Sequence, residues 1–419
     1  MDSPLIHHIY TSAATLYFES HTLLSLLEKA RAKNASLGVT GMLLFENGSF
    51  FQILEGPEAA VDALYKTIAQ DNRHEKCVTI IREPIAKRAF AEWTMGLGGT
   101  NAQELDEIVG LNDFFTSGKS FEGTSPGRAK KLLDAFRQGR WRSKVNYTKP
   151  VETNLIAKEV FEELPVPVIA HSPFQISMNV KKGLPEFSFA FQPIANIRTG
   201  EIKSYEALVR GKNGGSAAEV FDKISEEDKY PFDEILRISA IALAGKLGIK
   251  CDLNLNFLPR SLSSSPTAIS STVDAAKKAG IPSSAIIIEI TEKEIIENVE
   301  WFRDSIVKYR HEGVKFSLDD FGAGYSGLNL LADFQPESIK IDITLVRDID
   351  TNGPRQAIVR GILRTCQDLG IDVIAEGVES NAECKWFFDE GVELIQGYFL
   401  AKPGFEALPI PQMPKYFST

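Results

Sequence analysis

The chain has 419 residues, of which 43% are hydrophobic and 24% charged, and its formal net charge is -10 at pH 7. This composition is typical of a globular protein with room for two or three cores, and the negative charge argues against binding DNA or RNA through a basic surface. No apolar stretch approaches the roughly 20 residues of a membrane span, and the N-terminus lacks the pattern of a signal peptide, so we expect a cytoplasmic protein without a membrane anchor.

Residues 1–100 show a compact α+β pattern. The turn Glu46-Asn47-Gly48 separates two apolar runs and is a strong hairpin signal. Strands are predicted at 6–10, 39–45, 49–54 and 78–82, and helices at 23–33 and 59–69.

Residues 101–172 are predicted to form a helical extension and a linker. Apolar spacing indicates helices at 105–115 and 129–141, the second after the start signal Ser125-Pro126. The kink Pro165-Val166-Pro167 marks the linker that follows.

Residues 173–415 alternate buried strands with helices. Helices are predicted at 233–247, 299–311, 357–369 and 382–390, and apolar runs such as 285–289, 314–320 and 371–376 are the strands between them. This alternation predicts a parallel sheet, and seven or eight repeats over about 240 residues favour a closed (β/α) barrel.

Polar residues recur at or near the C-terminal ends of these strands, where a barrel of this kind builds its site. They are Glu206, Asn256, Glu289, Asp319, Asp320, Lys340, Glu376 and Gln396. Several carboxylates with one lysine suggest divalent cations and phosphate chemistry.

The motifs around these residues resemble those of EAL domains, phosphodiesterases that hydrolyse cyclic di-GMP. The resemblance covers residues 173–410 and implies a (β/α)8 barrel like that of triosephosphate isomerase. It rests on 206-EALVR-210, 256-NFLP-259, 289-EITE-292, 319-DDFGAGYS-326, 340-KID-342, 376-EGVE-379 and 396-QGY-398.

The resemblance implies two Mg²⁺ or Mn²⁺ ions. Glu206, Asn256, Glu289 and Asp319 offer hard oxygen ligands to the first ion. Asp319 bridges to the second ion, which Asp320 and Glu376 complete, so that two-metal hydrolysis of one phosphodiester is expected.

The remaining members of the set surround these ligands. Lys340 orients or deprotonates the attacking water, or neutralises charge near it. Gln396 hydrogen-bonds the water or the substrate, and Arg210 contacts a phosphate or a guanine. Glu292 anchors the loop 321–327, which the family places near a dimer interface. We therefore expect cyclic di-GMP as substrate and a homodimer.

Two simpler interpretations compete with that of an active phosphodiesterase. A single acidic residue after a strand is usually a helix cap or a solvated loop residue, but that would require the whole set to match by accident. A domain that binds cyclic di-GMP without cutting it usually lacks several ligands, and here all are retained.

A second resemblance covers residues 5–98 and points to BLUF domains, blue-light sensors that use flavin and have a ferredoxin-like α+β fold. It rests on Tyr10, Asn34, 38-GVTG-41, 51-FQILEG-56, 71-DNRH-74 and 90-FAEWTMG-96.

The resemblance implies that Tyr10 gives an electron to the excited flavin and that the hydrogen bonds of Gln52 then change. Asn34 would hold the polar edge of the ring. Arg73 meets a flavin phosphate or forms a surface salt bridge. Trp93 and Met95 carry the change to the last strand, although either residue alone would more often belong to a core.

Together these observations predict a phosphodiesterase for cyclic di-GMP whose activity rises with blue light sensed through FAD or FMN. The main alternative is a light-gated protein that binds cyclic di-GMP or a partner without turnover. A second alternative is an enzyme with a module that does not respond to light.

Overall fold

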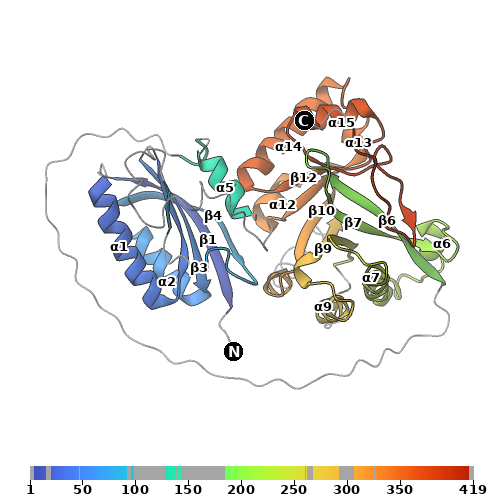
Figure 1. Ribbon diagram of the computed structural model, residues 1–419, viewed down its shortest axis with the longest axis horizontal. Helices are drawn as coiled ribbons and strands as arrows, with labels where there is room; N and C mark the ends of the chain where they lie inside the picture. Colours follow the sequence, from blue (N-terminus) through green and yellow to red (C-terminus); the bar gives the residue numbers. More distant parts are fainter. Residues whose placement is uncertain are drawn as a thin grey trace, which may run out of the picture. The chain divides into compact units, whose positions relative to one another are not determined.

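The computed structural model describes residues 4–15, 20–46, 48–91, 96–98, 128–137, 139–142, 185–259, 261, 268–291, 306–323 and 327–414. The chain divides into two compact units, Met1–Lys182 and Gly183–Thr419 (Figure 1). Most of the predicted extension and linker, with the helix at 105–115, lies outside the described residues, so the predicted boundaries at 100 and 172 stay predictions.

The first unit contains one sheet with the strand order β4-β1-β3-β2-β5. Strands β1 to β4 pair antiparallel, and β5 pairs parallel to β2. This order confirms the predicted ferredoxin-like fold. The elements are β1 Leu5–Ala14, α1 Ser20–Leu37, β2 Thr40–Glu46, β3 Ser49–Pro57, α2 Glu58–Ala69, β4 His74–Pro84, β5 Gly96–Gly98 and α5 Arg128–Arg137.

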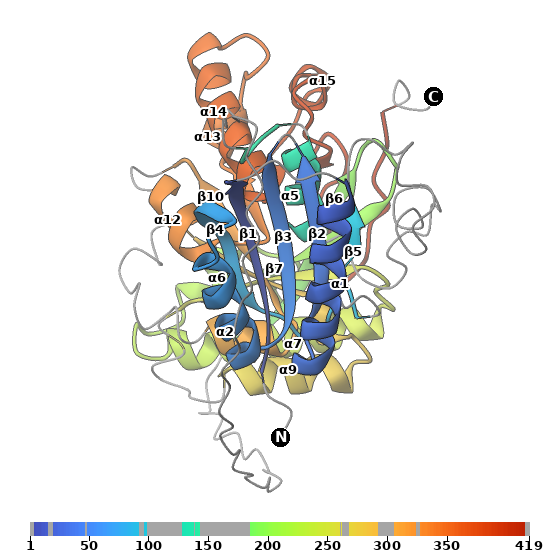
Figure 2. The same cartoon turned by 90° about the vertical axis from the view of Figure 1, so that its left-hand side faces the viewer.

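The two faces of this sheet are covered by different helices. Helices α1 and α2 cover one face and α5 lies behind the other (Figure 2). Because successive side chains of a strand point to opposite faces, Tyr10 packs in the core under α1 and α2, whereas its neighbour Ile9 joins Phe51 and Phe136 in the core under α5.

Helix α5 is shorter than the predicted span 129–141. It ends at Arg137, and Gly139 takes a positive φ of 93° that closes the last turn. Ion pairs hold both ends of the segment to the sheet: Arg128 Nη1 lies 2.8 Å from Glu83 Oε2, and Arg142 Nη2 lies 2.6 Å from Glu46 Oε1.

The second unit is built on a barrel surrounded by helices (Figure 1). Its strands are β6 Phe187–Asn196, β7 Ile202–Gly211, β8 Asp252–Asn256, β9 Ile286–Thr291, β10 Lys315–Phe321, β11 Ser338–Ile341, β12 Asp372–Ala375, β13 Leu394–Ile395 and β14 Gly404–Phe405. Its helices are α6 Ala217–Phe221, α7 Lys229–Lys246, α9 Ala268–Lys278, η1 Ser283–Ala285, α12 Gly327–Phe334, α13 Ile343–Val346, α14 Gly353–Leu369 and α15 Asn381–Asp389.

Strands β6 to β13 follow one another around the barrel, and pairing of β13 with β6 closes it. The predicted barrel is therefore confirmed, with one difference in strand direction. Strand β6 runs antiparallel to both β7 and β13. The cause is local, because a short turn joins β6 to β7: Asn196 Oδ1 accepts the N–H groups of Arg198 and Thr199, and Gly200 takes a positive φ of 76°.

Alternation along the strands separates core from site. In β8, Leu253 and Leu255 belong to the core shared with the surrounding helices, whereas Asn254 and Asn256 contact carboxylates of neighbouring strands. The same two-residue period places polar side chains of the other strands together inside the barrel.

Candidate functional site

The amino group of Lys340 on β11 lies among four carboxylates. Its Nζ atom is 3.1 Å from Glu206 Oε2, 3.0 Å from Asp319 Oδ1, 3.3 Å from Glu376 Oε2 and 3.5 Å from Glu289 Oε1. Lys340 is fully buried. The structure thus brings together residues that the sequence spreads over 171 positions, from 206 to 376.

Two amides complete this cluster. Asn256 Nδ2 donates to Glu206 Oε1 at 3.1 Å, and Gln396 Nε2 donates to Glu206 Oε2 at 2.7 Å. Gln396 directly follows β13 and Asn256 ends β8. Of the predicted barrel residues that the structure describes, all except Arg210 therefore meet around Glu206, Lys340 and Asp319.

Glu206 itself lies inside β7 rather than near the end of the strand, contrary to the expectation from its sequence. Its register partners are Gln192 on β6 and Asn254 on β8. The reason is that β7 and β6 continue as a two-stranded extension to Gly211, beyond the last paired residue of β8.

Asp319 and Asp320 owe their positions to an irregularity in β10. The pairing of β10 with β11 shifts register between Leu318 and Phe321, and Asp320 takes a positive φ of 53°. A non-glycine residue in this region is strained, and such strain is often found at functional sites. The irregularity lets adjacent carboxylates serve one site, which regular alternation would prevent.

The charges of the cluster oppose one another. Burial raises the pKa of Glu289 well above its ordinary value, and Glu206 and Asp319 add to this while Lys340 opposes it. Burial and nearby carboxylates raise the pKa of Glu376 to about 8. Burial alone would lower the pKa of Lys340, but the surrounding carboxylates raise it, so this lysine stays charged.

The donor set fits divalent cations. One oxygen each of Glu206, Glu289 and Asp319 lie within 4.8 Å of one another, as do oxygens of Asp319, Asp320 and Glu376. Glu289 Oε2 is buried and has no hydrogen-bond partner among the described residues. Hard oxygen donors in two clusters that share Asp319 are what a pair of Mg²⁺ or Mn²⁺ ions requires.

Two residues that the sequence did not single out support this cluster. Asn254 Nδ2 donates to Glu289 Oε1 at 2.8 Å, and Gln192 Oε1 accepts from Gln396 Nε2 at 3.3 Å. Both orient a member of the cluster. The alternation Asn254-Leu255-Asn256 was the available signal, because it places two amides on one face of β8.

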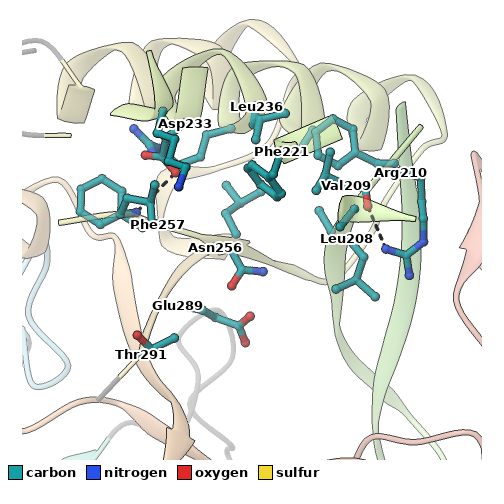
Figure 3. A pocket seen from close by; sticks show the side chains of 18 residues that line it. Leu208, Val209, Arg210, Phe221, Asp233, Leu236, Asn256, Phe257, Glu289 and Thr291 are labelled. Atoms are coloured by element: carbon teal, nitrogen blue, oxygen red, sulfur yellow. Dashed lines mark hydrogen bonds and ion pairs between the residues drawn. The ribbon is translucent and has the colours of Figure 1, made fainter. Parts of the chain in front are cut away.

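A cavity of about 450 Å³ adjoins the cluster between the barrel and α7. Asn256 and Glu289 form one side of it, and Arg210 lies toward one end (Figure 3). Leu208, Val209, Phe221 and Leu236 supply much of its apolar lining. The guanidinium of Arg210 donates to the carbonyl oxygen of Val209 at 2.8 Å. Mostly apolar walls beside a cluster of charged residues are typical of a small-molecule site.

Two predicted features of this site lie outside the described residues. They are Glu292 and part of the loop 321–327, so the proposed anchor of that loop stays a prediction.

In the first unit, the hydroxyl of Tyr10 donates a short hydrogen bond to Gln52 Oε1. Tyr10 is fully buried, and burial raises its pKa. Its ring meets that of Tyr65 on α2 at 4.9 Å between centroids. A phenol bonded to an amide that can offer either a donor or an acceptor suits the flavin chemistry predicted for this pair.

The contacts of the other predicted flavin residues do not test their proposed roles. Asn34 is buried near the end of α1, where its backbone carbonyl oxygen accepts the N–H of Val39 at 2.9 Å. Arg73 forms an ion pair with Asp71, and its contact with a flavin phosphate stays a prediction. Trp93 and Met95 lie outside the described residues.

Comparison with known proteins decides the family. A family model for the EAL domain matches residues 175–403, and one for sensors of blue light using FAD matches residues 5–96. The chain is 30% identical to the blue light- and temperature-regulated antirepressor BluF of Escherichia coli K12, over 94% of this chain and 97% of that protein. This chain belongs to the BLUF–EAL family.

Solved structures of similar proteins agree with the BLUF–EAL assignment. A complex of Klebsiella pneumoniae BlrP1 with manganese and cyclic di-GMP matches with a TM-score of 0.51 and 33% identity, over 96% of this chain and 97% of that one. A standalone EAL protein of Vibrio cholerae O395 with bound cyclic di-GMP matches with a TM-score of 0.53 and 46% identity, over 58% of this chain and all of that one.

Membership in the BLUF–EAL family confirms the predicted classes of cofactor. The BLUF family is described as using FAD, and the two carboxylate clusters of the EAL barrel fit divalent cations. Within the part of the chain that the structure describes, no helix combines the length and the apolar character needed to cross a membrane.

The charge balance of the BLUF–EAL barrel leads to a first prediction, on Lys340→Met. The change leaves four carboxylates without their buried cation, so the metal-free protein should lose about 3–5 kcal/mol of its free energy of unfolding. Urea unfolding in EDTA measures this loss, and added Mn²⁺ should recover part of it because a cation replaces the missing charge.

Lys315→Met is the matched control for Lys340→Met. Lys315 pairs with Asp252 at 2.8 Å at the opposite end of the barrel, where solvent reaches both side chains. Its loss should cost roughly 1 kcal/mol or less, with no response to Mn²⁺. Equal losses in the two variants would contradict the account of Lys340.

Proposed function

We propose that this protein hydrolyses cyclic di-GMP to linear pGpG under the control of blue light. The observation that carries the proposal is the complete set of oxygen donors around Lys340, in two clusters that share Asp319. It is supported by the match to the BlrP1 complex with manganese and cyclic di-GMP. Two bound divalent cations would lower the pKa of water and neutralise charge on the phosphate.

The residues of the site would hold these cations and orient the ligands. Glu206, Asn256, Glu289 and Asp319 would hold one cation, and Asp319, Asp320 and Glu376 the other. Gln396 keeps its amide against Glu206 and so fixes the orientation of that carboxylate. In the reaction the water oxygen bonds to phosphorus, the bond from phosphorus to O3′ breaks, and O3′ gains a proton.

Among the roles considered for Lys340, the structure favours an electrostatic one. Four carboxylates within 3.5 Å raise its pKa and keep the amine charged. A lysine held in this way is a poor base. We therefore assign it the task of offsetting the negative charge that the ligands and the phosphate bring together.

Substrate would extend from this cluster into the adjoining cavity. The volume of the cavity, about 450 Å³, is in the range of small-molecule sites, and its apolar walls suit the faces of a base. Arg210 lies toward one end of the cavity and would meet a phosphate or a guanine oxygen. Asn256 and Glu289 would thus lie between the base and the scissile phosphate.

Light would act through the first unit. The bond from Tyr10 to Gln52 would rearrange after excitation of the flavin, and α5, which covers the opposite face of the same sheet, would respond. Light can only shift an equilibrium between states of the barrel that hydrolyse cyclic di-GMP at different rates. We expect the lit state to be the more active, in a homodimer located in the cytoplasm.

A second function is favoured by one finding. The full-length relative from Escherichia coli is described as an antirepressor, which suggests a light-gated protein that binds a partner without turnover. The complete ligand set of this chain argues for hydrolysis instead.

The test is hydrolysis of cyclic di-GMP by the purified full chain with Mn²⁺ or Mg²⁺, in darkness and under blue light, together with a visible absorption spectrum. We expect a flavin spectrum, release of pGpG that stops in EDTA, and a higher rate in light. A flavin spectrum without turnover in either state would favour the partner-binding function.

A further inference from the structure

Two charged residues of α7 lie buried beside the cavity but outside the set of metal donors. Asp233 is 6% and Arg237 2% exposed. They are one helical turn apart and form an ion pair. Burying such a pair usually costs more than packing apolar side chains of similar size, so its presence next to the site calls for a reason beyond stability.

Both members of the pair contact the segment that follows β8. Asp233 Oδ1 accepts the N–H of Leu258 at 3.4 Å. The guanidinium of Arg237 lies over the ring of Phe257, 4.5 Å from its centroid. Figure 3 shows Asp233 and Phe257 together at one end of the cavity.

This segment begins directly after Asn256. On the side away from α7 it is bound to β9, because the N–H of Phe257 donates to the backbone carbonyl oxygen of Glu289 at 3.0 Å. The backbone of residues 257–258 is therefore held between β9 and the pair on α7. Because Asn256 ends the strand, these contacts set where its amide stands relative to Glu206, 3.1 Å away.

We propose that Asp233 and Arg237 are positioning residues, which hold the turn after β8 so that Asn256 can join Glu206, Glu289 and Asp319 around a divalent cation. The inference rests on the proposed function, because it assigns the pair to the same metal site. A purely structural pair would join α7 to β8 and leave cation binding unchanged.

The test replaces the pair by apolar residues of similar size in the double variant Asp233→Leu/Arg237→Met. Since no buried charge is left unpaired, the variant should fold and melt near the wild type. Mn²⁺ binding is followed by electron paramagnetic resonance of the free ion, without substrate. We expect affinity to fall about tenfold or more, as when a partner that orients a metal ligand is removed.

Turnover provides a second readout. The Mn²⁺ concentration for half-maximal hydrolysis should rise by the same factor, and high Mn²⁺ should restore most of kcat. The matched control is Asp252→Asn, which breaks the ion pair with Lys315 at the other end of the same strand. It should leave the Mn²⁺ dependence as in the wild type.

A double variant with unchanged Mn²⁺ affinity would overturn the proposal. If the double variant does not fold, Phe257→Leu removes the ring under Arg237 without altering charge, and unchanged Mn²⁺ affinity there would overturn it as well. Wild-type protein that binds Mn²⁺ without hydrolysing cyclic di-GMP would refute the proposed function alone, because the binding titration still tests the pair.

Discussion

Asp319→Asn should lower kcat for cyclic di-GMP by at least about a thousandfold. Asp319 is the one carboxylate common to both metal clusters, so its loss weakens both cation sites. Cations of this kind stabilise a transition state by several kcal/mol, and each 1.4 kcal/mol is about a factor of ten in rate. The rate of pGpG release at saturating Mn²⁺ measures the loss.

Melting experiments separate this loss from unfolding. Without metal the variant should melt no lower than the wild type, because one of four carboxylates around Lys340 is neutralised. Mn²⁺ should raise the melting temperature of the wild type more than that of the variant. A variant that keeps more than a tenth of wild-type kcat would refute the bridging role.

Tyr10→Phe should abolish the light response and leave dark hydrolysis unchanged. Phenylalanine keeps the ring that packs against Tyr65 and lies in the core under α1 and α2. It removes the hydroxyl that donates to Gln52. The ratio of lit to dark activity should fall to about one, and the light-induced change in the flavin spectrum should vanish.

Tyr65→Phe is the control for Tyr10→Phe. Tyr65 accepts from the hydroxyl of Thr79 at 3.1 Å and touches Tyr10 only through its ring. This variant should keep the spectral change. A light response that survived in Tyr10→Phe would show that the electron donor has been assigned to the wrong residue.

Periodicity explains why so much of the barrel was predictable. Apolar runs of four to seven residues between helices predicted the strands around Glu289, Asp319 and Glu376, and neighbouring parallel strands necessarily bring such residues to one end. The motif resemblances then supplied roles that spacing alone does not contain. In the first unit, the hairpin signal at Glu46-Asn47-Gly48 predicted the antiparallel pairing of β2 with β3, but not the pairing of β3 with β1 that places Gln52 opposite Tyr10.

What could not be predicted depends on burial and on strand direction. The direction of β6 follows from a five-residue turn that resembles many loops. Asn254 and Gln192 are polar residues in strands. The alternation Asn254-Leu255-Asn256 places two amides on one face, but it does not show that this face is buried. Asp233 and Arg237 have the spacing of an ordinary pair on a solvated helix face. Only the assembled barrel shows that the pair is enclosed.

The closure of the barrel has a consequence for how the chain acquires activity during synthesis. Closure depends on Leu394 and Ile395 pairing with residues 195 and 196, and the next residue, Gln396, bonds to Glu206. Residues made first and last in the barrel therefore meet at one seam. A growing or truncated chain that stops before residue 394 has every carboxylate of the site but lacks the strand that closes the barrel around them. Metal binding and hydrolysis should therefore appear only when this last part of the chain has been made.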